Sequence, residues 1–112
     1  MSYTIRTTSQ FEREFKRLSK RYESLSEDLR QLLDQLRDDP KVGTEIGGGF
    51  RKIRLAVRSK GKGKRGGLRV VTYNSIIVEL HNGTIWLMTI YDKSELSTIS
   101  DNALKLLLKE TK

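Results

Sequence analysis

The chain contains no cysteine, one histidine and one proline among its 112 residues. The lack of cysteine excludes disulfide bonds and thiolate chemistry, and it fits a reducing cytoplasm. A single histidine without cysteine leaves no credible zinc or iron site. Any catalysis is therefore expected to use Lys, Arg, Tyr, Asp, Glu, Ser or Thr, with no metal and no other cofactor.

Long apolar runs are also missing. No segment approaches the ~20 apolar residues of a membrane-spanning helix, and the N-terminus lacks the apolar core of a signal peptide. We therefore expect a cytoplasmic protein without a membrane partner. The composition, 36% hydrophobic and 32% charged, is that of an ordinary globular protein, and the length suits one domain over residues 1–112.

Acidic residues are absent from the segment 51–73, which carries nine basic side chains. The formal charge is +1 over residues 1–42, +8 over residues 43–78 and −1 over residues 79–112. The net charge of +8 is thus concentrated in the middle of the chain. Such a concentration creates a local field for a polyanion, and nucleic acid phosphates are the commonest partner of this kind.

Periodicity predicts the order β-α-α-β-β-β-α. A short strand at 3–7 precedes two amphipathic helices, the first begun by a Ser9–Glu12 capping box and the second ended by Asp39-Pro40. The expected strands then cover 50–58, 68–80 with a bulge near Asn74-Ser75, and 84–91 after a tight turn at 81–83. A last helix begins at Ser100 or Asp101. The pattern indicates an α+β domain, in which an N-terminal helical hairpin and a C-terminal helix cover an antiparallel sheet.

Alternation over 50–58 places Ile53, Leu55 and Val57 on one face of the strand, and Lys52, Arg54 and Arg58 on the other. These cations could simply form the solvated face of a half-buried strand. However, a hairpin through the Lys/Gly-rich loop brings Arg69 close to Arg54, and no acid occurs nearby in the sequence. Cations that repel one another in the free protein favour an anionic ligand.

Three other patterns are less informative. Residues 61–66 match G-x-G-x-x-G, but that fingerprint requires a following helix, and here a strand follows. His81 lies beside an Asn-Gly pair, where exposure is more common than catalysis. Trp86 lies in the middle of an apolar strand, so packing is favoured over stacking on a base.

The runs GGGFRKIRLAVRSKGKGKRGGLRVVTY and LMTIYDKSEL resemble the RelE/HigB superfamily of bacterial toxins, most closely the HigB2-like branch. The resemblance covers residues 47–99. It implies a RelE-like fold, a toxin of a type II toxin–antitoxin pair, and a ribosome-dependent endoribonuclease that cuts mRNA and inhibits translation. The implied partners are the 70S ribosome, mRNA and a cognate antitoxin, which we expect to be a helix-turn-helix protein.

The same resemblance assigns the site residues. The catalytic set that it implies is Lys52, Arg54, Lys64, Arg69, Tyr91 and Lys93. The further RNA-binding residues that we expect are Arg51, Arg58, Lys60, Lys62, Arg65 and Tyr73. RNA can be cut without a metal because its 2′-hydroxyl attacks the adjacent phosphate. Arg69, supported by Arg54, suits the charge on the phosphorane. Lys52 or Lys64 is the expected proton acceptor, and Tyr91 or Lys93 the donor.

Two alternatives stay open. A toxin of the same fold could bind another target, such as gyrase, and cleave nothing. The domain could also be a non-catalytic nucleic-acid-binding module, in which loss of Arg69 would merely weaken binding.

Overall fold

The computed structural model describes residues 2–61, 63, 66–77 and 82–111. Its strands form one five-stranded sheet in the order β1-β5-β4-β3-β2. The strands are β1 (Ser2–Thr7), β2 (Thr44–Gly47), β3 (Phe50–Leu55), β4 (Leu68–Ile77) and β5 (Asn82–Asp92). The helices are α1 (Ser9–Arg21), α2 (Leu25–Asp38) and α3 (Asp101–Leu107). β1 is parallel to β5, and the other neighbours are antiparallel.

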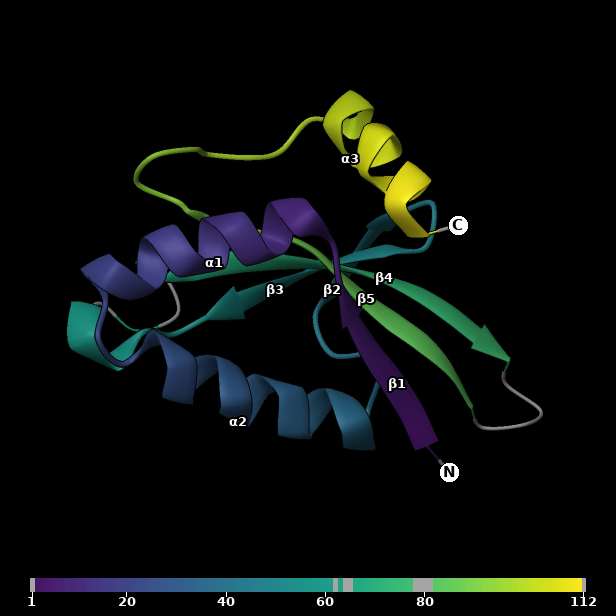
Figure 1. Ribbon diagram of the computed structural model, residues 1–112, viewed down its shortest axis with the longest axis horizontal. Helices are drawn as coiled ribbons and strands as arrows, with labels where there is room; N and C mark the ends of the chain where they lie inside the picture. The colour runs from purple at the N-terminus through teal and green to yellow at the C-terminus, as the bar shows by residue number, and fades with distance from the viewer. Residues whose placement is uncertain (1, 62, 64–65, 78–81, 112) are drawn as a thin grey trace.

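Helices cover both faces of the sheet (Figure 1). The apolar stripes of α1 and α2 pack on one face, where they form the larger core with residues such as Ile53, Val70 and Ile90. We call this the α1–α2 face. Leu104 of α3 packs on the other face against Phe50, Val71, Met88 and Tyr91. We call this the α3 face.

The predicted element order and fold class are confirmed, with two differences: β1 joins the sheet in parallel to β5, so the sheet is not wholly antiparallel, and one strand, β2, is added. The short edge strand β2 was not expected, because its sequence, Thr44–Gly47, shows no apolar alternation, and all four of its residues are exposed in the structure. It pairs with the first part of β3, so that Thr44 lies opposite Lys52. Ile53, Leu55 and Val57 are all buried in the larger core, as the alternation predicted.

Several boundaries differ from the expectations. Thr8, not Ser9, caps α1, and its hydroxyl accepts a hydrogen bond from the Phe11 amide at 3.0 Å. β3 ends at Leu55, so Arg58 lies in a 3₁₀ turn that follows the strand. Asn82 and Gly83 pair with Ile77 and Ile76, so they belong to β5 and not to a turn. His81 and residues 78–80 lie outside the described residues.

The irregularity of the β4–β5 ladder lies elsewhere than predicted. β4 is continuous through Asn74-Ser75, and the register shifts between Val71 and Thr72. Val71 pairs with Thr89 and Thr72 with Leu87, which leaves Met88 as the extra residue of β5. This bulge reverses the alternation of side chains in β5.

Among the described residues, no helix is long and apolar enough to cross a membrane.

Gly67 marks the place where the chain enters β4 beside the end of β3. A Cβ atom built at this position would lie 2.1 Å from the carbonyl oxygen of Leu55. We expect Gly67→Ala to lower the free energy of unfolding by on the order of 2–3 kcal/mol, because β3 and β4 would have to separate there. Urea unfolding followed by circular dichroism measures this.

The matched control is Gly61→Ala. Gly61 has a φ of +72° and open space around its Cβ position, so only the backbone term of about 1 kcal/mol applies. Equal destabilisation by the two substitutions would contradict the close approach at Gly67.

Candidate functional site: a cationic row across three strands

Arg54, Arg69 and Tyr91 form one row across the three central strands of the sheet. Arg54 of β3 lies opposite Arg69 of β4, and Arg69 lies opposite Tyr91 of β5. Directly opposed residues share a face, with Cβ atoms about 5 Å apart. Tyr91 belongs to the smaller core beneath α3, so the row lies on the α3 face.

The three side chains differ in exposure. Arg54 is exposed, whereas Arg69 retains 4% of its accessible surface and Tyr91 retains 5%. The Arg69 Nη1 atom donates a hydrogen bond to the carbonyl oxygen of Leu68 at 3.2 Å. The backbone thus holds the guanidinium of Arg69 against the sheet, and Arg54 extends the positive charge toward solvent.

Like charges directly opposite each other destabilise a pair of strands. No described acid lies within ion-pair distance of Arg54 or Lys52. Lys52 is half-buried two residues before Arg54 on β3, and it lies opposite Val71. An anion bound over the row would relieve this repulsion.

Tyr91 supplies a phenol beside the guanidinium of Arg69. Its hydroxyl oxygen is buried and has no hydrogen-bond partner within 3.5 Å in the described part of the chain. Burial raises the pKa of the Tyr91 phenol above its ordinary value, and the nearby charge of Arg69 opposes this only in part. At neutral pH the Tyr91 phenol is therefore protonated, and besides Arg69 the Thr98 side chain also interacts with it.

Other predicted residues lie near the row or outside the described chain. Tyr73 shares the α3 face four residues further along β4, and its ring centroid is 5.3 Å from that of Phe50. Lys93 directly follows β5 and is exposed. Lys62, Lys64 and Arg65 lie outside the described residues.

Three of the predicted RNA-binding cations make contacts within the protein. Arg58 Nε lies 3.0 Å from Asp28, and Lys60 Nζ lies 2.7 Å from Asp92. The Arg51 guanidinium donates to the carbonyl oxygens of Lys41 and Gly43. The expectation that no acid neutralises the basic segment was wrong, because acids distant in sequence reach it. The structure brings Arg54, Arg69 and Tyr91 together and turns Arg58 and Lys60 to other partners.

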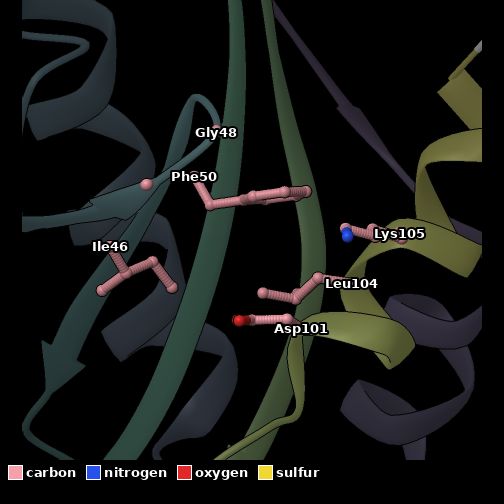
Figure 2. A pocket seen from close by; sticks show the side chains of 7 residues that line it. Ile46, Gly48, Phe50, Asp101, Leu104 and Lys105 are labelled. Carbon is pink, nitrogen blue, oxygen red and sulfur yellow. The ribbon is translucent and has the colours of Figure 1, made fainter.

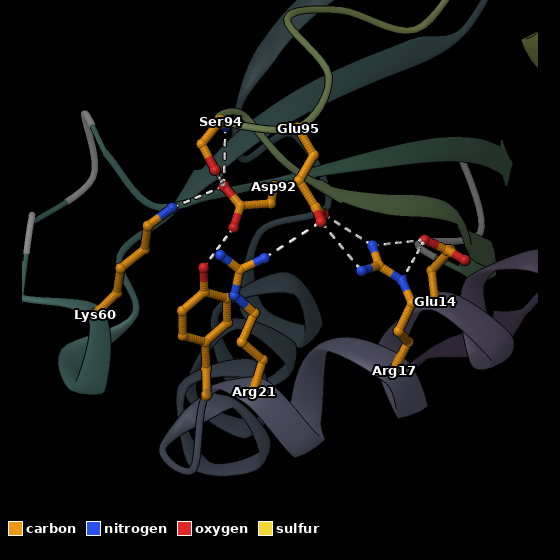
Figure 3. A network of polar contacts seen from close by, with 8 residues as sticks. Glu14, Arg17, Arg21, Lys60, Asp92, Ser94 and Glu95 are labelled. Atoms are coloured by element: carbon orange, nitrogen blue, oxygen red, sulfur yellow. Dashed lines mark hydrogen bonds and ion pairs between the residues drawn. The ribbon is translucent and has the colours of Figure 1, made fainter.

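Asp92 is a residue whose importance the sequence did not reveal. Its carboxylate is fully buried at the end of β5. It accepts hydrogen bonds from the Tyr22 hydroxyl at 2.5 Å, Lys60 Nζ at 2.7 Å, and the Ser94 amide and hydroxyl at 2.9 and 2.7 Å (Figure 3). The only signal in the sequence was a lone acid at the end of an apolar strand, between Tyr91 and Lys93.

The Asp92 contacts position the end of the cationic row. They join β5, α1 and the 3₁₀ turn Arg58–Lys60, from which the basic loop departs. Burial alone would raise the pKa of Asp92, but the hydrogen bonds from Lys60, Tyr22 and Ser94 outweigh it and hold this pKa well below its ordinary value. A second, exposed cluster beside it links Glu95 to Arg17 and Arg21 (Figure 3).

A small apolar cavity of about 230 Å³ lies between α3 and the β2–β3 turn. Figure 2 shows Ile46, Phe50 and Leu104 around it, with Asp101 and Lys105 at its edge. Within the described residues, no group of three or more His, Cys, Asp or Glu could hold a metal ion.

No family model matches the chain. The α+β arrangement of helices around the five-stranded sheet is the RelE-like fold. A solved structure that shares it is that of a double arginine-to-alanine mutant of the E. coli toxin RelE in the free state. The superposition has a TM-score of 0.58 and covers 97% of each chain, at 14% sequence identity.

The Asp92 network predicts an acid-sensitive fold. Because the folded-state pKa of Asp92 lies below the unfolded value of about 4, its contribution to stability is complete above that pH and is lost as the pH falls further. We expect the free energy of unfolding, measured with urea between about pH 6 and pH 2, to fall less steeply for Asp92→Asn than for the parent protein. At neutral pH the substitution should cost about 3 kcal/mol, because Lys60 loses its counter-charge while largely buried.

Glu95→Gln is the control for this experiment. It removes a carboxylate from the adjacent exposed cluster, where a change within about 1 kcal/mol is expected. If Asp92→Asn also stayed within that range and kept the parent's pH dependence, the network would not support the fold.

Proposed function

We propose that this protein is the toxin of a type II toxin–antitoxin pair and that it cuts mRNA on the ribosome. The observation that carries the proposal is the row of Arg54, Arg69 and Tyr91 across β3, β4 and β5. It combines two guanidinium groups and a buried phenol on one sheet face, in the fold of a known toxin. The motifs G-x-R-K-I-R and K-G-K-R-G-G further support a member of the HigB2-like branch.

The proposed reaction needs no group beyond the substrate and the protein. The 2′-oxygen of the RNA attacks the adjacent phosphorus, and the P–O5′ bond breaks. The products are a 2′,3′-cyclic phosphate and a free 5′-hydroxyl. The Arg69 guanidinium, fixed by the Leu68 carbonyl, binds two phosphate oxygens and stabilises the extra charge of the phosphorane, while Arg54 binds from the solvent side.

Proton transfer completes the reaction. Tyr91 suits the donor to the leaving 5′-oxygen, because it lies beside Arg69 in the row and its raised pKa keeps it protonated at neutral pH. Lys93, exposed just beyond β5, is the alternative donor. Lys52, on the face of the row, or Lys64 accepts the 2′-proton.

The proposed dependence on the ribosome follows from the few substrate atoms that the row can position. Side chains from one sheet row can bind a phosphate, but they do not by themselves align the 2′-oxygen with the breaking bond. In-line alignment accounts for several kcal/mol of a barrier. We propose that the ribosome supplies it in the cytoplasm, and that a cognate antitoxin, expected to have a helix-turn-helix domain, blocks the row by bringing acidic side chains or by covering it.

Arg69 provides the main test. We expect Arg69→Ala to abolish growth arrest and to reduce ribosome-dependent cleavage by at least about 100-fold, because one charged donor to the phosphorane is lost. Primer extension on transcripts after expression measures the cleavage. Arg69→Lys keeps a charge in this largely buried position but loses the planar guanidinium that binds two phosphate oxygens. Cleavage by this variant should therefore also fall strongly.

The control is Lys16→Ala on the exposed surface of α1, which should cut as the parent does. Thermal unfolding and antitoxin binding show that each variant is folded. The absence of new 5′ ends from the parent protein would indicate a toxin of this fold that is not a nuclease. Reduced RNA binding without any cleavage would indicate a binding module.

Tyr91→Phe isolates the role of the hydroxyl group. The ring stays packed beneath α3, and an unsatisfied buried oxygen is removed, so the free energy of unfolding should be unchanged or rise by up to about 1 kcal/mol. Cleavage should nevertheless fall by about 100-fold, in the range of general acid catalysis. Full activity of a stable Tyr91→Phe variant would assign the donor to Lys93.

A further inference from the structure

A second row lies on the α3 face, nearer the other end of β4. Arg6 of β1 lies opposite Trp86 of β5, and Trp86 lies opposite Tyr73 of β4. Trp86 and Tyr73 both pack at the margin of the smaller core and are half-buried, so part of each ring is accessible. Arg6 is exposed at the end of this row.

The C-terminal segment forms the other wall of a cavity above this second row. α3 and the following 3₁₀ turn, Leu108–Thr111, contribute Lys105, Leu108, Lys109 and Thr111 to it. The cavity has a volume of about 960 Å³ and is lined by polar and apolar surface. The cavity thus has two aromatic rings on the sheet and cations on both walls.

The described part of the chain offers these cations no ion-pair partner. Across residues 2–61, 63, 66–77 and 82–111, no carboxylate lies within ion-pair distance of Arg6, Lys105 or Lys109. Glu110 also lines the cavity, but its carboxylate accepts hydrogen bonds from the Ser9 amide at 2.8 Å and the Ser9 hydroxyl at 2.9 Å. That carboxylate is therefore occupied at the start of α1.

We propose that this cavity is a second binding site for single-stranded RNA, separate from the cationic row. A base stacks on the accessible faces of Trp86 and Tyr73, and the flanking phosphates bind Arg6, Lys105 and Lys109. Aromatic platforms beside cations suit nucleotides, whereas an acidic peptide would use the cations alone. The inference rests on the proposed function in taking RNA as the ligand.

The two sites are distinct in space. Tyr73 and Arg69 are four residues apart on β4, about 13 Å along the strand. Leu104 of α3 packs on Val71 between them. RNA in the second site therefore does not occupy the position of the scissile phosphate.

Trp86 is the only tryptophan, so its fluorescence reports on this site directly. The probe is a mixed-sequence 2′-O-methyl oligoribonucleotide of about ten nucleotides, within the usual range of such sites. It lacks the free 2′-hydroxyl that cleavage needs. We expect saturable quenching of Trp86, with a Kd that rises about 5- to 10-fold in Arg6→Ala and again in Lys109→Ala. Both side chains are exposed, so the variants should fold.

Two control variants and one alternative ligand, polyglutamate, decide the outcome. Lys16→Ala, which removes one charge from α1, and Arg69→Ala should leave the quenching Kd within about 2-fold of the parent value. No quenching by the oligonucleotide would overturn the proposal. A loss of quenching in Arg69→Ala equal to that in Arg6→Ala would also overturn it, since the RNA would then bind at the cationic row. Equal quenching by polyglutamate of similar length would overturn it in favour of an acidic protein partner.

The result is independent of the cleavage test. Primer extension reports on the cationic row and needs a reactive 2′-hydroxyl, whereas the Trp86 titration uses RNA that cannot be cut. Cleavage without quenching would leave the proposed function intact and remove the second site. Quenching without cleavage would do the reverse.

Discussion

The register of β4 between β3 and β5 decides which side chains share the α3 face. Leu68 and Val70 enter the larger core, which places Arg69 on the opposite face between Arg54 and Tyr91. A slip by one residue would turn the guanidinium of Arg69 into the larger, apolar core and would place Leu68 and Val70 on the α3 face. Because burying a charge among apolar side chains costs far more than any single contact in the ladder, the packing of α1 and α2 enforces this register.

The bulge at Met88 extends the same constraint to the second half of β5. With regular alternation from Tyr91, Thr89 would be followed by Leu87 and Ile85 on the α3 face, and Trp86 would point toward α1 and α2. The extra residue reverses this, so Leu87 and Ile85 complete the larger core and Trp86 shares the α3 face with Tyr91. One inserted residue thus allows both rows to form on one face of the sheet.

The sequence predicted the helices and the order of strands, because the apolar stripes of α1 and α2 and the alternation in β3 have clear periods. It could not locate the bulge, since Ile85 to Ile90 is almost uniformly apolar and contains no alternation to interrupt. β2 was missed for a related reason. It is a short exposed edge whose pairing with Lys52 depends on β3 and not on its own residues.

The pairing of strands predicted the neighbours of the basic residues better than the local charge of the sequence did. The alternation of β3 and the hairpin correctly suggested that Arg54 and Arg69 are neighbours, because that inference used only the geometry of adjacent strands. Treating the whole segment 51–73 as one basic surface failed for Arg58 and Lys60. Their partners, Asp28 and Asp92, come from α2 and from the end of β5, and no local count of charges includes them. The internal ion pairs fix the base of the loop and the end of β5. The basic side chains of the segment are thus divided between residues that form internal ion pairs, such as Arg58 and Lys60, and residues such as Arg54 that form none with a described acid.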